Sequence, residues 1–389
     1  IILFSPLLLA ACSVSKHVPE GEYILDKVEV KSDQKEYDAS PLVPYVRQKE
    51  KPKLFSLFKN PFTRKPVIFD TLLLQAMQNQ GYMNSGVSLL TEKKKKKLKA
   101  TYLLHPGQPF TIGSVKYEVR DDSIQQLLHL DQPENQMLKP GTRFTVEALD
   151  AERKRIAGLL SNQGYFRFNK DFIQFAADTI SGSRDIALTL QLMKYKANSS
   201  APEVNHPRYV IRKVNYLSND SDDIHLRRQV LLNATAIKEG RPYDASALQA
   251  TYNNFARLQA VKYTNIRFTE MPDSNLLDCN IQVSTLKPST ISFQPEGTNT
   301  AGDLGAAASL TYTNRNLFRG SEQLSIELRG AYEAIKGLEG YQDQNYTEFS
   351  VATKLVFPRF LAPFLSKSFR RRQSASSEVS VSWDFQNRP

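Results

Sequence analysis

The strongest constraint on the fold of this chain is an alternating pattern between Gly297 and Gly320. Side chains two residues apart lie on the same face of a strand, so alternation gives one apolar face and one small, polar face. This pattern is typical of the wall of a membrane barrel, which has lipid outside and water inside. The two sets are Ala306, Ala308, Leu310 and Tyr312 against Ala307, Ser309, Thr311 and Thr313.

The same alternation returns in three later segments, 321–332, 347–357 and 378–386. Strands that cross a bilayer need roughly 9–11 residues, and these segments fit that length. Strands in a soluble sandwich show the same alternation but usually have roughly 5–6 residues. We therefore expect residues 288–389 to form the first strands, roughly five, of an antiparallel transmembrane β-barrel that is incomplete here.

The first twelve residues have the pattern of a bacterial lipoprotein signal peptide. An apolar run leads through small residues directly to Cys12. We expect the Cys12 thiol to be acylated, which leaves Cys279 on the apolar face of a strand as a small core residue. The chain begins with Ile1 rather than Met and ends just after a strand pattern, so we expect it to be truncated at both ends.

The net charge of +11 raises the question of a nucleic-acid partner. Much of the positive charge lies in short runs such as Lys93 to Lys97 and Arg370 to Arg372. A nucleic-acid surface needs stacking aromatic residues among its basic ones, and these runs have none interleaved, so we expect no such partner. We interpret Lys93 to Lys97 as a charged turn or strand edge that prevents edge-to-edge association.

The sequence contains no recognisable catalytic or metal-binding motif. Its histidines are not paired at metal-ligand spacing, and phosphate-binding, dinucleotide-binding and nucleophile-elbow motifs are missing. Two pairs of carboxylates, Asp121-Asp122 and Asp222-Asp223, are interpreted as turn and helix-start residues. The sequence contains no run of 18 apolar residues, so it predicts no membrane-spanning helix. We expect neither an enzyme nor a cofactor.

The first 287 residues contain internal repeats. The sequence Asn-Gln-Gly-Tyr occurs at 79–82 and again at 162–165, an offset of 165 − 82 = 83. Ile112 and Gly141 recur as Ile211 and Gly240, an offset of 99 in both cases. Self-similarity at a fixed spacing indicates one structural unit used several times.

Each unit reads as strand, helix, helix, strand, strand. In the second unit, 111–120 is strand-like, 123–130 is a short helix, and Thr145 caps a second helix that Gly164 ends. Residues 165–175 and 186–192 are expected to form the closing hairpin.

Two helices beside a small mixed sheet, with Gly-Tyr before the last hairpin, resemble the POTRA domain. Three such units followed by Glu296 to Thr300 and Asn316 to Gly320 resemble the BamA/TamA outer-membrane assembly family, and the Cys12 motif resembles its lipoprotein branch, TamL. The resemblance implies a lipoprotein signal peptide at 1–12, a tether at 13–22, POTRA 1 with a basic insertion at 23–107, POTRA 2 at 108–197, POTRA 3 at 208–287 and barrel strands at 288–389.

The resemblance also implies a function without bond chemistry. The protein would lie in the bacterial outer membrane with periplasmic POTRA domains, and would assist insertion and translocation of outer-membrane proteins by adding client strands to its own sheet edges. The implied partners are a TamB-like periplasm-spanning protein, unfolded outer-membrane protein clients and outer-membrane lipid. A two-partner-type secretion pore for one dedicated exoprotein, and a passive surface porin or adhesin, are the alternatives.

Overall fold

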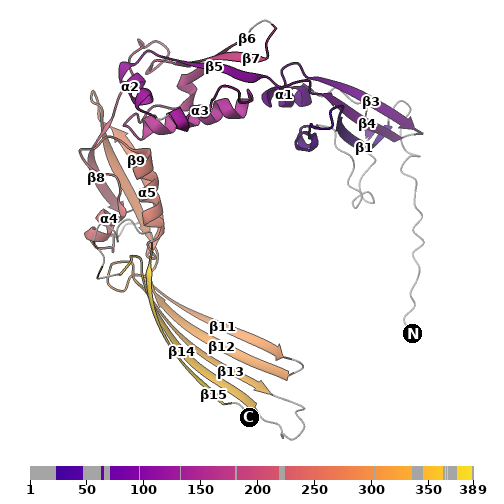
Figure 1. Ribbon diagram of the computed structural model, residues 1–389. Helices are drawn as coiled ribbons and strands as arrows, with labels where there is room; N and C mark the ends of the chain where they lie inside the picture. The colour runs from indigo at the N-terminus through magenta and orange to yellow at the C-terminus, as the bar shows by residue number, and fades with distance from the viewer. Residues whose placement is uncertain are drawn as a thin grey trace, which may run out of the picture. The chain divides into compact units, whose positions relative to one another are not determined.

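The computed structural model contains three small α+β modules and one large antiparallel sheet (Figure 1). The structure describes residues 23–46, 63–64, 71–95, 97–131, 133–179, 182–218, 224–300, 303–334, 345–361, 364, 366 and 375–387. The chain divides into two compact units, one of residues 1–157 and 169–205, and one of residues 158–168 and 206–389. No helix in the described part of the chain is long and apolar enough to cross a membrane.

Module 1 has a sheet with the strand order β2-β1-β4-β3. Strand β1 is parallel to β4, and β3 is antiparallel to β4. A short 3-10 helix stands where the repeat predicts a first helix, because Pro44 lies inside it and cannot donate a hydrogen bond to an α-helical ladder. The elements are β1 (Tyr23–Ser32), η2 (Ser40–Tyr45), β2 (Thr63–Arg64), α1 (Thr71–Asn79), β3 (Gly86–Lys94) and β4 (Lys97–His105).

Modules 2 and 3 share one topology. In each, the third strand lies in the middle, parallel to the first and antiparallel to the second. Module 2 contains β5 (Thr111–Val119), α2 (Asp122–Leu130), η4 (Pro133–Asn135), α3 (Val146–Ser161), η5 (Lys170–Phe172), β6 (Ile173–Thr179) and β7 (Asp185–Leu192). Module 3 contains β8 (Val210–Ser218), α4 (Arg228–Ala234), α5 (Ala245–Ala256), β9 (Val261–Glu270) and β10 (Leu276–Thr285).

The core of module 3 shows why these residues form this fold. The central strand β10 alternates between buried and half-buried positions over most of its length, and Leu277, Cys279 and Ile281 are fully buried under the helices. Phe255 of α5 and Leu231 of α4 pack into the same cluster. Asp244 caps α5 by accepting hydrogen bonds from Ser246 N and Ala247 N, which fixes the start of the helix.

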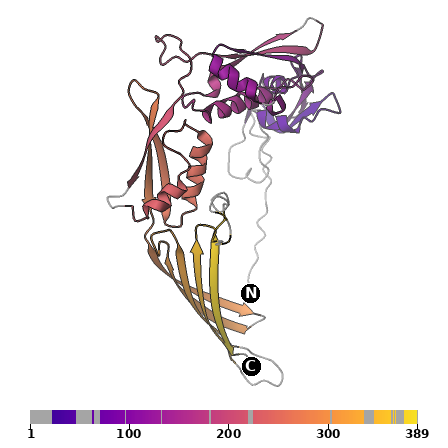
Figure 2. The ribbon, with the colours of Figure 1, turned by 60° about the vertical axis from the view of Figure 1, so that its left-hand side comes forward.

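The large sheet is an antiparallel meander in which each strand pairs with the next (Figures 1 and 2). Its strands have 11 to 13 residues, as the alternation predicts. The sheet is not closed within the described residues, since β11 and β15 each pair on one side only. The strands are β11 (Ser289–Thr300), β12 (Asp303–Asn314), β13 (Gln323–Ala334), β14 (Asn345–Phe357) and β15 (Ser377–Asn387).

Two predicted boundaries differ from the structure. The predicted strand 165–175 begins only at Ile173, because residues 165–168 form a turn whose side chains pack elsewhere, as shown below. The sequence also predicts a turn at 298–303 between the first two sheet strands, but β11 continues to Thr300 and β12 begins at Asp303.

Candidate functional site

The large sheet presents one apolar face across all five strands. The register aligns Phe293, Leu310, Leu328, Val351 and Trp383 in one row that crosses the whole sheet. All of these side chains but Val351 are exposed, and Val351 is half-buried. A soluble protein rarely leaves so continuous an apolar surface in water. The neighbouring rows repeat the pattern with Ile291, Tyr312, Ile326, Thr353 and Val381, and with Pro295, Ala308, Gly330, Phe349 and Phe385.

The opposite face of the same sheet is polar. Arg329 of β13 reaches Glu296 of β11 at 3.3 Å, across the small residues of the strand between them. Lys354 of β14 and Glu378 of β15 form a second ion pair at 2.8 Å. A sheet that is apolar on one side and carries ion pairs on the other matches a wall between lipid and water.

The modules leave specific strand edges open. In module 2 the 141–143 loop covers the start of the outer edge of β5. Ile112 N donates to the Thr142 carbonyl, and Gly141 N donates to the Ile112 carbonyl. In module 3 the 240–242 loop occupies β8 in the same way. Strand β9 is engaged at its middle, where Ile266 N donates to the Tyr252 hydroxyl at 3.0 Å, whereas β6 lacks an equivalent cover among the described residues. An extended peptide can be added to such an edge by main-chain hydrogen bonds.

A turn between β12 and β13 fastens the sheet to module 3. Ser321 is fully buried, and its Oγ accepts a hydrogen bond from Ala260 N at 2.8 Å. Asn316 donates from its side chain to the His225 carbonyl at 2.8 Å, and Arg227 N donates to the Arg319 carbonyl. Residues 316–320 stand in the sequence as a turn and as part of the family resemblance, and no local pattern there encodes these contacts with module 3.

A buried carboxylate holds this turn in shape. Glu322 is 4% exposed, and its Oε2 accepts hydrogen bonds from Gly320 N at 2.9 Å and Phe318 N at 3.3 Å. Arg227 of module 3 donates to Glu322 Oε1 at 3.3 Å. A Cβ on Gly320 would lie 2.0 Å from that same oxygen, so the close approach of backbone and carboxylate requires glycine.

The turn after the second helix makes the same contact in every module. The carbonyl of Gly81 accepts a hydrogen bond from Phe110 N at 2.8 Å, just before β5. The carbonyl of Gly164 accepts one from Tyr209 N at 2.8 Å, just before β8. The carbonyl of Ala260 accepts one from Leu286 N at 2.8 Å, shortly before β11. The repeated Asn-Gln-Gly-Tyr motif is therefore a connector as well as a helix stop.

An apolar side chain follows each of the first two connectors. Met83 packs against the core of module 2. Phe166, at the matching position 83 residues later, packs in module 3 with its ring 5.0 Å from Tyr243 and 5.5 Å from Phe268, centroid to centroid. This packing is the reason that residues 165–168 do not continue as a strand.

An ion pair secures the second connector. Arg167 contacts Glu270 at 2.8 Å, and the Tyr209 hydroxyl donates to the same carboxylate at 2.8 Å. Partial burial raises the pKa of Glu270, but the hydrogen bonds from Arg167 and Tyr209 outweigh it, so the net pKa is lowered. The carboxylate is therefore ionised at neutral pH and holds both partners.

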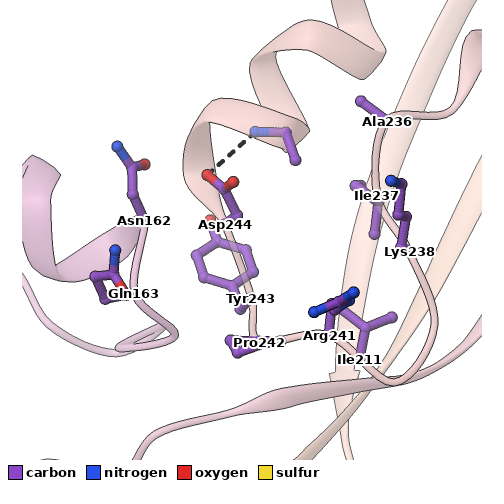
Figure 3. Close-up of a pocket in the computed structure, with 11 residues that line it drawn as sticks. Asn162, Gln163, Ile211, Ala236, Ile237, Lys238, Arg241, Pro242, Tyr243 and Asp244 are labelled. Carbon is purple, nitrogen blue, oxygen red and sulfur yellow. Dashed lines mark hydrogen bonds between the residues drawn. The ribbon is translucent and has the colours of Figure 1, made fainter.

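A pocket of about 390 Å³ lies beside this connector (Figure 3). Asn162 and Gln163 face Tyr243 and Asp244 across it, and Lys238 and Arg241 line its far side. Its polar groups already serve the fold, because Asn162 Oδ1 and Asp244 Oδ1 both accept from Ser246 N. The lining has no histidine and no cysteine, and its one carboxylate, Asp244, caps α5.

Module 2 contains a buried charge network. Glu152 of α3 is fully buried and accepts hydrogen bonds from Tyr117 Oη and Met137 N, both at 2.9 Å. Arg155 donates to Glu152 through Nε at 2.9 Å and Nη2 at 2.6 Å, and it also pairs with Asp131. The pKa of Glu152 is lowered overall, since burial raises it but Arg155 and Met137 N stabilise the anion more.

The residues singled out by sequence fall in different places. Cys12, Asp222, Asp223 and most of the basic insertion lie outside the described residues. Asp121 caps α2, and Thr145 Oγ1 accepts from Ala148 N, so both act at helix starts. Cys279 is fully buried in module 3, where burial raises the pKa of its thiol to about 12. No cluster of metal-binding side chains occurs among the described residues.

Comparison of the sequence with protein-family models gives no match, and comparison with curated proteins gives none either. Among solved structures, the chain is similar to POTRA3-5 of BamA from Haemophilus influenzae, at 14% identity over 69% of this chain and 99% of that one, with a TM-score of 0.37. It is also similar to Haemophilus ducreyi BamA lacking POTRA domains 1-3, at 13% identity over 64% of this chain, with a TM-score of 0.38.

A third similar structure is CdiB from Acinetobacter baumannii, at 11% identity over 72% of this chain, with a TM-score of 0.31. The chain spans 48% of the Haemophilus ducreyi BamA chain and 55% of the CdiB chain. At such identities and scores we base fold and function on the registers and contacts described above.

Proposed function

We propose that this chain is the periplasmic arm and the first wall strands of an outer-membrane β-barrel protein that assists insertion and translocation of other outer-membrane proteins. The observation that carries the proposal is the five-stranded sheet with an apolar face unbroken from β11 to β15. Such a face is stable in contact with lipid. The strands of the sheet have 11 to 13 residues, which is long enough to cross a bilayer.

The open edge of β6 supplies the activity in this proposal. An unfolded outer-membrane protein is rich in strands whose backbone groups need partners before they enter lipid. Strand addition at an open edge pairs those groups with little demand on the client sequence. The β11 edge would then accept a client strand at the membrane itself. By resemblance, the stable partner would be a TamB-like periplasm-spanning protein, and the apolar face of the sheet would contact outer-membrane lipid.

The test is complementation of a strain depleted of the protein. The wild-type gene is expected to restore outer-membrane protein levels, and Val351→Arg is expected to fail, because a lipid-facing Arg costs about 2–4 kcal/mol near the bilayer centre. Ala352→Arg is the matched control, since the neighbouring position faces Glu327 and Ser382 on the polar side. The measurements are the fraction of protein inserted in the outer membrane and the abundance of its clients.

Three results would contradict the proposal. Depletion that leaves every outer-membrane protein and envelope lipid unchanged would refute the assembly role. Loss of one exoprotein alone would favour the secretion pore. Equal insertion of Val351→Arg and Ala352→Arg would show that the apolar face of the sheet does not face lipid.

We also propose that Cys12 carries the lipid anchor. Cells fed a labelled fatty acid should label the wild-type protein and not the Cys12→Ala variant. The buried Cys279 thiol, with its raised pKa, is not a competing acceptor. Label retained by Cys12→Ala would rule the assignment out.

A further inference from the structure

Module 1 carries a lysine-rich hairpin tip that the proposed function leaves unused. Strands β3 and β4 meet in a tight turn at Lys95, which has a positive φ of 57°. Lys93, Lys94, Lys95 and Lys97 are all exposed, as are the last five residues of β3. The tip therefore projects beyond the apolar core of its module.

This tip lies beside the start of the described chain (Figure 1). Strand β1 begins at Tyr23, and its second residue, Ile24, pairs with Lys97 in the parallel ladder. Lys93 Nζ lies 4.8 Å from the centroid of the Tyr23 ring. The tip is thus fixed next to the point at which the tether enters module 1.

The carboxylates around the tip do not balance its charge. Asp26 pairs with Lys97 at 2.9 Å, and Glu92 pairs with Lys99 at 3.8 Å. Glu29 is engaged further along β1, by Lys27, Lys31 and Lys99. Within the described part of the chain, Lys94 and Lys95 have no ion-pair partner, and Lys93 has only the Tyr23 ring.

We propose that this hairpin tip, Lys93 to Lys95 with Lys97, is a docking site for the anionic phospholipid surface of a membrane. The inference rests on the proposed acylation of Cys12. From Cys12 to Tyr23 the chain has 23 − 12 = 11 residue steps, which reach at most about 40 Å and about 18 Å on average if the tether is flexible. An anchored acyl group therefore keeps the tip within a short distance of the bilayer.

The chemistry of the tip favours a lipid surface over other anions. Lysine ammonium groups are compact charges without the planar fork that selects single phosphates, so they suit a diffuse sheet of headgroups. A basic cluster near an anionic bilayer surface adds electrostatic attraction to the attachment that the acylated Cys12 provides. Among the described residues, the ring that lies against these lysines is that of Tyr23, and one ring gives little stacking for nucleic acid.

The experiment measures how close the tip comes to a membrane in the intact protein. The full chain is reconstituted in bilayers of phosphatidylcholine, with or without a minor share of phosphatidylglycerol. A fluorophore is placed on Thr91→Cys, an exposed and uncharged position on β3, and lipids with a quencher on the headgroup report contact. Cys279 does not compete for the label, because it is fully buried.

We expect phosphatidylglycerol to increase quenching and salt to reverse it over the Debye range. Lys93→Gln, Lys94→Gln and Lys95→Gln together should weaken contact about 100-fold, because each lysine near an anionic surface contributes roughly fivefold. The control neutralises Lys116, Lys139 and Lys196 in module 2, which removes equal charge and should leave quenching unchanged. In Cys12→Ala, quenching should fall yet still respond to phosphatidylglycerol.

Quenching that depends on neither phosphatidylglycerol nor salt would overturn the proposal of a membrane docking site. An acidic polypeptide would then be the class of partner that remains. Equal quenching in the tip variant and the module 2 control would overturn it too. Client levels are measured separately, so a failed docking site with normal client assembly is distinguishable from failure of the proposed function.

Discussion

Glu152→Ala should lower the free energy of unfolding of module 2 by about 3–5 kcal/mol, because it leaves Arg155 buried without its main counter-charge. Arg155 is largely buried, and its other ion-pair partner in the described part of the chain is Asp131. The substitution also removes the acceptor for Tyr117 Oη and Met137 N. Hydrogen exchange of the β5 and β7 amides in the full chain measures the effect on this module alone.

Module 3 provides the matched control for this prediction. Positions 251 and 254, which are 152 + 99 and 155 + 99, carry Thr251 and Asn254. Thr251 Oγ1 accepts from Ala236 N at 3.0 Å, and Asn254 donates to the Ala234 carbonyl at 3.0 Å. The paired change Glu152→Thr with Arg155→Asn should therefore cost less than Glu152→Ala alone, since it removes both charges together. A paired variant less stable than the single one would contradict this account.

Acid should reduce the difference between wild type and Glu152→Ala. The folded pKa of Glu152 lies below its unfolded value, so its stabilising effect is present above the ordinary glutamate pKa of about 4.3. That stability is lost as the pH falls through the folded pKa, and the two proteins should then converge. The same hydrogen-exchange measurement, in buffers taken below the ordinary glutamate pKa, tests the direction.

Gly81→Ala should loosen the connector between modules 1 and 2 at a cost of about 2–4 kcal/mol. Gly81 has a φ of 93°, which an L side chain rarely adopts, and an added Cβ would lie 2.3 Å from the Phe144 carbonyl oxygen. That atom belongs to the backbone, so it cannot move aside as a flexible side chain would. The expected result is faster protease cleavage between residues 81 and 110 in the full chain.

Two other glycines distinguish the effect of backbone strain from that of the steric clash with Phe144. Gly141 also has a positive φ, of 82°, but an added Cβ meets no atom within 4 Å, so Gly141→Ala reports backbone strain alone. Gly158 lies inside α3 with open space around it, and Gly158→Ala should be neutral or slightly stabilising. Cleavage of Gly81→Ala no faster than that of Gly141→Ala would show that the close approach to Phe144 is not limiting.

Local pattern was sufficient where neighbours along the chain decide the structure. The alternation in 303–314 and 345–357 predicts β12 and β14 and their two faces, because side-chain direction has a period of two whatever the strand packs against. Thr145 and Gly164 likewise predict the ends of α3 from backbone hydrogen bonding alone. The α+β character of the fold follows from these signals.

Local pattern failed where a residue serves a distant part of the chain. Phe166 continues an apparent strand in the sequence, but its ring packs against Tyr209, Tyr243 and Phe268. The buried roles of Glu322 and Glu152 have no local signal, since an isolated glutamate in sequence is most often a solvated surface charge.

By itself the sequence determined the strand and helix periods, the repeated unit and the amphipathic character of the last hundred residues, because these depend on contacts within a few positions. Only the tertiary structure decided which sheet edges remain open, how Ser321 and Glu322 join the large sheet to module 3, and that the lysine tip lies beside Tyr23. Those features arise between residues far apart in the chain, where packing and desolvation, rather than local conformational preference, choose the partner.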